Sequence, residues 1–277
     1  MSANHAARGA QGEVLLACEG VGKRFGGVRA LEDVSFSIRR GEIYGLIGPN
    51  GAGKTTLFNL LTGIYAPDSG RFVFDGASLD GLKPHQVTLR GIARTFQNIR
   101  LFANLSALEN VMIGRHARTR AGVIGAVMRN RATRDEEARI EARAMELLKF
   151  VGIEARADDA AGSLPYGDQR RLEIARALAT DPSLVALDEP AAGMNATESR
   201  ALATLVRNVR ALGITVLLIE HDMKLVMSLC DRLLVLDHGE RIIEGTPAEA
   251  QSDPRVIDAY LGVELPESGV APGDAGT

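Results

Sequence analysis

The sequence predicts an α/β fold with a parallel core sheet, an antiparallel β subdomain and an inserted helical subdomain. Three short apolar runs have the nearly continuous hydrophobicity of strands buried on both faces of a parallel sheet, at 42–48, 183–189 and 214–220. Other segments alternate between apolar and polar residues, which is typical of half-buried strands. A long block with apolar residues at helical spacing lies between strands of the parallel set, so we expect an inserted helical subdomain.

The elements can be assigned in order along the chain. Alternation predicts strands at Val34, Phe36 and Ile38 and from Arg71 onward, and together with the segment 13–20 they indicate the antiparallel subdomain. Helix-like sequence follows each continuous apolar run, as in doubly wound folds. The helical block runs from about Leu105 to Ala179, and the segment 232–245 indicates a closing hairpin.

We expect one large domain at 13–262, with its helical subdomain at about 98–180 and flexible tails at 1–12 and 263–277. The Arg-rich segment 115–134 is interpreted as a solvated face with a loop. A patch beside lipid headgroups is the weaker alternative for it.

Composition excludes several classes of protein. The 277 residues include 32 basic and 35 acidic side chains, a net charge of −3, so no overall positive field favours nucleic acid. Cys18 and Cys230 are far apart and lack metal-ligand spacing, which fits a reducing cytoplasm. The N-terminus has no apolar core for a secretory signal, and no run approaches the roughly 18 apolar residues of a membrane span. A role at a membrane therefore requires a partner.

A phosphate-binding loop follows the first continuous apolar run. The segment GPNGAGKT at 48–55 matches G-x-x-x-x-G-K-[ST] between a predicted strand and a predicted helix, the context that the motif requires. Glycines let backbone N–H groups surround phosphate, Lys54 is expected to reach the β- and γ-phosphates, and the Thr55 hydroxyl to coordinate Mg²⁺. The predicted ATP-binding residues here are Gly48, Asn50, Gly51, Ala52, Gly53, Lys54, Thr55 and Thr56.

Two acids end the second continuous apolar run, LVALDE. We expect Asp188 to support Mg²⁺ and Glu189 to polarise the attacking water. Three further residues are candidates for the same site. His221 follows the third apolar run, so it is expected beside the γ-phosphate. Gln97 lies in a loop from which its amide could reach Mg²⁺ or the attacking water. Phe25 could stack on adenine, with ordinary packing as the alternative.

The order of these motifs resembles that of ATP-binding cassette (ABC) ATPases, over roughly residues 13–262. In that family two cassettes pair head to tail, and a signature segment of one caps ATP held by the phosphate loop of the other. The resemblance assigns this signature in trans to Leu164, Tyr166, Gly167 and Asp168. The physical argument agrees, because the following sequence GDQRRLEIARALA is a strong helix with an N-terminus suited to an anion.

The signature departs from the common pattern Leu-Ser-Gly-Gly-Gln. Pro165 offers neither the hydroxyl nor the N–H of the usual Ser, and Asp168 places an acid where Gln is common. Asn195 replaces the usual aspartate of a further motif. We expect the composite site to close on ATP, and to hydrolyse it more slowly than the opposite site.

Several stretches resemble one subgroup, the ATPases of branched-chain amino acid uptake: ARTFQNIRLFANLSALENVMIGRH, RRLEIARALATDP, LDEPAAGMN, IEHDMKLVM and the terminal GTPAEAQSDPRVIDAYLG. The resemblance implies a bacterial importer with two transmembrane permease subunits, a second ABC ATPase as hetero- or homodimer partner, and a periplasmic substrate-binding protein. It places the chain at the cytoplasmic face of the plasma membrane. Apolar Ile99, Leu101 and Phe102 after Gln97 are suited to receive a permease helix, with local packing as the alternative.

Three other functions remain open. The same motifs would serve a urea, amide or lipopolysaccharide transport ATPase. A soluble ABC ATPase acting on DNA or ribosomes is disfavoured, because the chain has one cassette, no long heptad run and a net charge of −3. A nonhydrolytic regulatory module is disfavoured by the presence of both Glu189 and His221.

Overall fold

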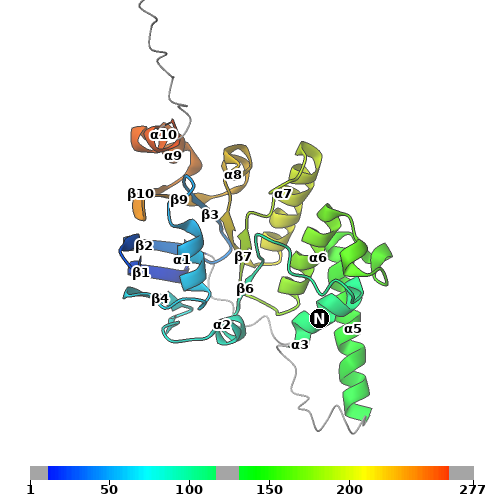
Figure 1. Ribbon diagram of the computed structural model, residues 1–277. Helices are drawn as coiled ribbons and strands as arrows, with labels where there is room; N and C mark the ends of the chain where they lie inside the picture. Colours follow the sequence, from blue (N-terminus) through cyan, green and yellow to red (C-terminus); the bar gives the residue numbers. More distant parts are fainter. Residues whose placement is uncertain (1–11, 117–130, 262–277) are drawn as a thin grey trace, which may run out of the picture.

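Two β-sheets and a group of packed helices make up the protein in a computed structural model, which describes residues 12–116 and 131–261 (Figure 1). Residues 1–11 and 263–277 of the predicted tails and most of the Arg-rich segment 115–134 lie outside the described residues. Figure 1 shows the antiparallel sheet on one side of the molecule and helices α3, α5 and α6 on the other, with the larger sheet between them.

The larger sheet has six strands in the order β10-β9-β3-β8-β7-β6. Its centre is formed by β3 (Ile43–Ile47), β8 (Thr215–Ile219) and β7 (Leu184–Asp188), which are parallel and buried at every residue. Side chains from alternate positions enter two separate hydrophobic clusters, one on each face of the sheet. The predicted parallel core sheet is confirmed, and its two-sided burial explains the continuous apolar runs.

The edges of this sheet come from shorter or later segments. β9 (Arg232–Asp237) runs parallel to β3, and β10 (Glu240–Gly245) returns antiparallel to β9, which confirms the predicted hairpin. At the other edge β6 (Ile92–Arg94) pairs parallel with β7. A strand of three residues carries too little periodicity to be assigned from sequence, and it was not predicted.

The smaller sheet has the order β2-β1-β4-β5 and is antiparallel. Its strands are β1 (Val14–Phe25), β2 (Val28–Arg39), β4 (Ser69–Phe74) and β5 (Ala77–Ser78). Val34, Phe36 and Ile38 are buried, as the alternation predicts. The sheet packs over α1 (Lys54–Leu61) and one face of the parallel sheet, and together they enclose one of the two hydrophobic clusters.

The helical group consists of α3 (Ala107–His116), α5 (Arg131–Val151) and α6 (Tyr166–Leu178), which pack against one another. Two 3₁₀ turns, Glu154–Arg156 and Ala161–Ser163, connect α5 to α6. The remaining helices flank the parallel sheet or follow its last strand: α2 (Pro84–Arg90), α7 (Ala196–Ala211), α8 (Met223–Leu229), α9 (Pro247–Ser252) and α10 (Pro254–Leu261). β3, β7 and β8 are parallel, so the residues that follow them meet at one edge of the sheet.

Candidate functional site

The loop at residues 48–53 joins β3 to α1 and has a backbone that only glycine adopts freely at three positions. Gly48, Gly51 and Gly53 have φ of 151°, 82° and 98°. A Cβ on Gly48 would lie 2.1 Å from the Leu236 carbonyl oxygen, so the loop also lies too close to β9 for a side chain. The motif residues 48–56 thus form one turn that opens into α1.

The first turn of α1 has no side-chain cap, and neither has that of α6. By contrast Asn195, Asp222 and Thr246 cap α7, α8 and α9 by accepting hydrogen bonds from backbone N–H groups. The N–H groups that begin α1 and α6 are therefore available to an anion, and the helix dipole favours one there.

Lys54 begins α1, with only 7% of its surface exposed. Its Nζ donates to the carbonyl oxygens of Gly48 and Pro49, at 2.6 and 2.8 Å, so the ammonium is held across the mouth of the loop. Burial lowers the pKa of Lys54, and the nearby Glu189 carboxylate opposes that change.

Glu189 is the point at which the predicted catalytic residues meet. Gln97 Nε2 donates to Glu189 Oε2 at 2.9 Å, and His221 Nδ1 lies 3.8 Å from the same oxygen. The Glu189 backbone is left-handed, with φ of 44°, and its N–H donates to the Ile219 carbonyl at 2.9 Å, which ties the ends of β7 and β8 together.

His221 is placed by the two acids that flank it. Asp222 caps α8, and Glu220 is buried with its Oε1 accepting from the Ala191 N–H at 2.8 Å and its Oε2 from the His221 N–H at 3.3 Å. Burial raises the pKa of Glu220, and these backbone N–H groups oppose the rise. The His221 side chain remains 60% exposed, on the same side as Glu189.

Asp188 is buried at the end of β7 and has an arginine partner that sequence reasoning missed. Arg94 Nη2 lies 3.4 Å from Asp188 Oδ2, and its Nη1 donates to Asn59 Oδ1 and Thr62 Oγ1 at 3.0 and 2.7 Å. Burial raises the pKa of Asp188, and Arg94 is the chief group that lowers it. Arg94 ends the unpredicted strand β6, and nothing in its local sequence indicates that β6 lies beside β7.

The guanidinium of Arg94 is also enclosed by aromatic rings. Its Cζ lies 4.4 Å from the ring centroid of Phe58 and 4.6 Å from that of Phe96. Both contacts have cation–π geometry and hold the guanidinium in one orientation.

Phe25 lies at the end of β1, with 42% of its surface exposed. Its ring meets Tyr65 edge-on, with the centroids 5.3 Å apart. The ring is therefore neither buried in the core nor free of neighbours, and it presents exposed aromatic surface next to Tyr65, a few residues beyond the end of α1.

The signature residues form the start of α6. Leu164 is buried, Tyr166 is 44% exposed, and Gly167 lies in the first helical turn after the N-cap Pro165. Asp168 is not an unpaired acid: its carboxylate lies 3.1 Å from Arg156 Nε and 3.9 Å from Arg171 Nη1. These two arginines offset the negative charge that replaces the common Gln.

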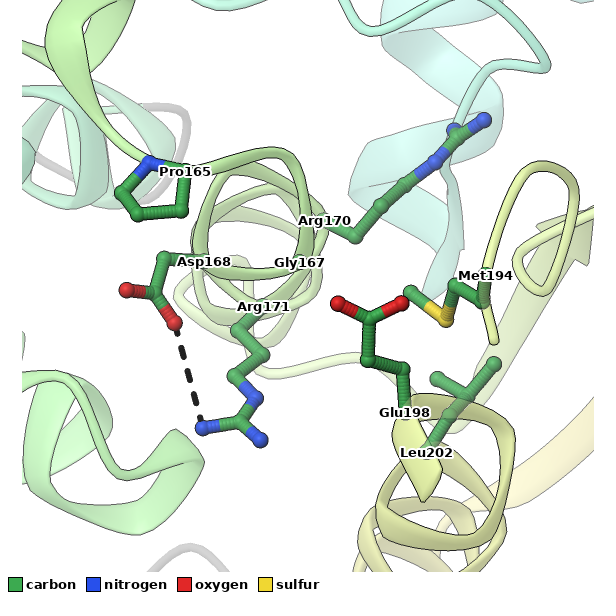
Figure 2. Close-up of a pocket in the computed structure, with 8 residues that line it drawn as sticks. All are labelled: Pro165, Gly167, Asp168, Arg170, Arg171, Met194, Glu198 and Leu202. Atoms are coloured by element: carbon green, nitrogen blue, oxygen red, sulfur yellow. Dashed lines mark ion pairs between the residues drawn. The ribbon is translucent and has the colours of Figure 1, made fainter. Parts of the chain in front are cut away.

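A small cavity of about 110 Å³ lies between the start of α6 and the start of α7 (Figure 2). Asp168, Arg171 and Glu198 line it, and Arg170 leaves α6 on the side away from Asp168. Asn195, which replaces the usual aspartate, accepts from the N–H groups of Thr197 and Glu198 at 2.9 and 3.0 Å. Its side chain therefore serves as the N-cap of α7.

Ile99, Leu101 and Phe102 differ in exposure. Leu101 packs against the hydrophobic cluster under α6, Ile99 is half-buried, and Phe102 is 50% exposed. Local packing thus accounts for Leu101 and leaves Phe102 as the apolar surface of this segment.

Within residues 12–116 and 131–261 there is no group of three or more His, Cys, Asp and Glu side chains arranged to hold a metal. Nor does the described part of the chain contain a helix long and apolar enough to span a bilayer.

The fold and the loop at residues 48–55 define a P-loop nucleotide-binding protein. Residues 31–192 match the ABC transporter family, and residues 240–265 match the branched-chain amino acid ATP-binding cassette transporter family. The chain belongs to the ABC transporter family, as one of its ATP-binding cassettes. The predicted family and the predicted class of enzyme, a transport ATPase, are confirmed.

Known relatives cover almost the whole chain. The high-affinity branched-chain amino acid transport ATP-binding protein LivG of Salmonella typhimurium is 44% identical over 249 residues, which are 90% of this chain and 98% of the relative. The ADP conformation of MJ1267, an ATP-binding cassette of an ABC transporter, is 34% identical with a TM-score of 0.79, over 90% of this chain and 99% of that one. A dimeric post-hydrolysis structure of the cassette MJ0796, bound to ADP and Pi, is 26% identical with a TM-score of 0.71, over 84% and 99% of the two chains.

Proposed function

We propose that this chain is the ATP-hydrolysing subunit of a bacterial ABC importer for branched-chain or other hydrophobic amino acids. The observation that carries the class of cargo is the match of residues 240–265 to the branched-chain cassette family, in agreement with the similarity to LivG. The observation that carries hydrolysis is the contact of Gln97 with Glu189, with His221 beside the same carboxylate.

ATP binds in this proposal at residues 48–56, with Phe25 stacking on adenine. The backbone N–H groups of the loop and of the first turn of α1 receive the phosphates. Lys54 exchanges its two carbonyl contacts for phosphate oxygens, which is favourable because an ammonium bonds more strongly to an anion than to a neutral carbonyl.

Glu189 polarises the attacking water, as the catalytic carboxylate. Gln97 and His221 contact or approach the same carboxylate, so both are placed to orient the water and the γ-phosphate. The exposure of His221 leaves its ring accessible to a nucleotide from the solvent side.

Mg²⁺ fits this site through oxygen ligands, which hard cations prefer. The exposed Thr55 hydroxyl and the Gln97 amide are the candidate direct ligands, and Asp188 acts on the ion through water because Arg94 already pairs with its carboxylate. When bound, the ion neutralises charge on the β- and γ-phosphates.

The second half of each site comes from a second ABC ATPase, the same chain or a sister chain. Leu164, Tyr166, Gly167 and Asp168 cap the nucleotide of that partner, through the uncapped N-terminus of α6. The paired charge of Asp168 removes the objection that an acid would repel phosphate there.

The other partners are two transmembrane permeases, with a periplasmic substrate-binding protein acting indirectly and no nucleic acid. Exposed Phe102 supports a permease contact next to Gln97. We place the chain as a peripheral subunit on the cytoplasmic face of the plasma membrane. Residues 13–262 form its ATP-binding domain, and the packing of α3, α5 and α6 supports a helical subdomain at about 98–180.

The test is to co-purify the membrane complex and measure ATP turnover with leucine, isoleucine or valine, and with urea as the comparison. Stimulation by the branched-chain amino acids through the substrate-binding protein is expected. Stimulation by urea alone would reassign the cargo, and a complex that hydrolyses no ATP under any condition would overturn the proposed activity.

A further inference from the structure

The helix that begins at the signature is bonded to the segment that carries Gln97. Three side chains of α6 make these bonds: Arg170, Glu173 and Arg176. Arg170 and Glu173 are 3% and 1% exposed, so the bonds lie within the protein interior. Figure 2 shows Arg170 leaving α6 on the side opposite Asp168, with both residues lining the same cavity.

Arg170 holds the backbone carbonyl groups of the two peptide units that flank the Gln97 Cα. Its Nη1 donates to the Phe96 carbonyl at 2.8 Å, and its Nη2 donates to the Gln97 carbonyl at 2.5 Å. Nη2 also donates to the Tyr166 hydroxyl at 2.8 Å, so the same guanidinium contacts a signature side chain.

Glu173 and Arg176 hold the same segment from its other end. Glu173 Oε1 accepts from the N–H groups of Phe96 and Arg100, at 3.3 and 3.5 Å. Arg176 Nη1 donates to the Arg100 carbonyl at 2.6 Å. Backbone groups on either side of Gln97 therefore find partners on α6 and not in regular secondary structure.

Arg170 and Glu173 form an ion pair, and this pair does not stabilise the fold in the way an apolar contact would. Arg170 Nη1 and Glu173 Oε2 lie 3.5 Å apart, and that oxygen is buried without a hydrogen-bond partner. A buried ion pair is often no more stabilising than apolar side chains of similar volume. What the pair supplies is a fixed geometry between α6 and residues 96–100.

We propose that Arg170 and Glu173 are positioning residues that make Gln97 and the signature end of α6 move as one unit. The inference rests on the proposed function, in which the signature caps the partner's ATP while Gln97 acts on ATP bound by its own chain. The pair then couples the two sites of the dimer, because a shift of α6 toward the partner's nucleotide moves Gln97 relative to Glu189.

The test compares the full-length wild-type chain with the full-length double variant Arg170→Met/Glu173→Met, which removes both charges and keeps side-chain volume. The matched control is Arg232→Met/Glu244→Met. That pair is partly buried and also holds backbone, since Arg232 donates to the Ser37 carbonyl at 3.1 Å and Glu244 accepts from the Ser37 N–H at 3.2 Å. Arg232 begins β9, whereas the phosphate loop approaches that strand at Leu236, near its other end. Amide hydrogen exchange of residues 96–102 is measured with and without ATP, with Glu189→Gln added to the wild type, the double variant and the control so that ATP is not consumed. Steady-state ATP hydrolysis is measured separately, in the assembled complex with Glu189 intact.

In the double variant we expect exchange at residues 96–102 to rise about tenfold and to lose its response to ATP. We expect kcat to fall about tenfold while KM for ATP stays within about twofold, because ATP contacts on the phosphate loop are untouched. The control should keep wild-type exchange and kcat. If the double variant does not fold, Arg170→Lys takes its place, since lysine lacks the planar fork whose two nitrogens reach the Phe96 and Gln97 carbonyls and the Tyr166 hydroxyl.

Wild-type exchange and kcat in the folded variant would overturn the inference, as would the same losses in the control. Failure of the proposed function is a separate outcome, because then the wild-type complex itself would hydrolyse no ATP.

Discussion

Gln97 and Glu189 are 92 positions apart in the chain, and the amide of one donates to the carboxylate of the other at 2.9 Å. The contact joins a loop beyond the edge strand β6 to the end of the central strand β7. It brings a candidate ligand of the cation into direct contact with the carboxylate assigned to the attacking water. A substitution at either residue should therefore alter the position of the other side chain.

Glu189→Gln should bind ATP and fail to hydrolyse it. The amide retains the size of the carboxylate but cannot polarise water as a base, and loss of a general base typically lowers the rate by about 10²–10⁴-fold. Binding of labelled ATP and single-turnover hydrolysis are the measurements. Glu146→Gln, an exposed change on α5, is the control. Full turnover in Glu189→Gln would assign the base elsewhere.

Arg94→Leu should destabilise the nucleotide-free protein by about 3–5 kcal/mol, because it leaves the buried Asp188 carboxylate without its partner. Arg94→Lys keeps a charge and should lose less. Urea unfolding measures both changes in the free energy of unfolding. The double variant Arg94→Leu/Asp188→Asn should recover much of the loss, and a double variant as unstable as Arg94→Leu would show that the ion pair is not the cause.

Pro165→Ser should speed hydrolysis at the site that this signature caps, since it adds a hydroxyl and an N–H near the γ-phosphate. We expect a gain of roughly threefold to tenfold, below the 10²–10³-fold that a single preorganised donor contributes at most in other enzymes. The change should also stabilise α6 by up to about 1 kcal/mol, because Ser is a good N-cap and Pro165 makes no cap bond. An unchanged single-turnover rate would discard the idea that the signature slows this site.

Glu220→Gln should alter how stability depends on pH. Burial raises the pKa of Glu220 above its ordinary value of 4.5, so between the two values the folded state binds more protons than the unfolded state. The contribution of Glu220 to the free energy of unfolding therefore falls as pH rises through that window, and in Glu220→Gln this part of the slope should vanish.

Unfolding curves from about pH 4.5 to 8 measure the effect on the nucleotide-free chain. Glu249→Gln is a control of opposite sign, because hydrogen bonds from Thr246 lower the pKa of Glu249 and its stabilising contribution is lost as pH falls. A Glu220→Gln curve parallel to the wild type would contradict the assignment.

Local patterns in the sequence predicted the buried central strands and the alternating strands, and they missed the short edge strand β6. The burial of β3, β7 and β8 on both faces leaves a continuous apolar run, and strands that must be half-buried alternate. The phosphate loop needs glycine at positions such as Gly48, where a side chain would collide with β9. Such constraints act on adjacent residues, so they can be recognised without the fold.

The sequence by itself thus determined an α/β nucleotide-binding protein and the residues that end its central strands. Only the tertiary structure decided that Arg94 pairs with Asp188, that Gln97 contacts Glu189, and that α6 holds the backbone beside Gln97. These contacts join residues distant in the chain, and side chains such as arginine and glutamate are equally common on solvated surfaces. Which of them become buried and paired depends on the placement of whole strands and helices, which no local pattern encodes.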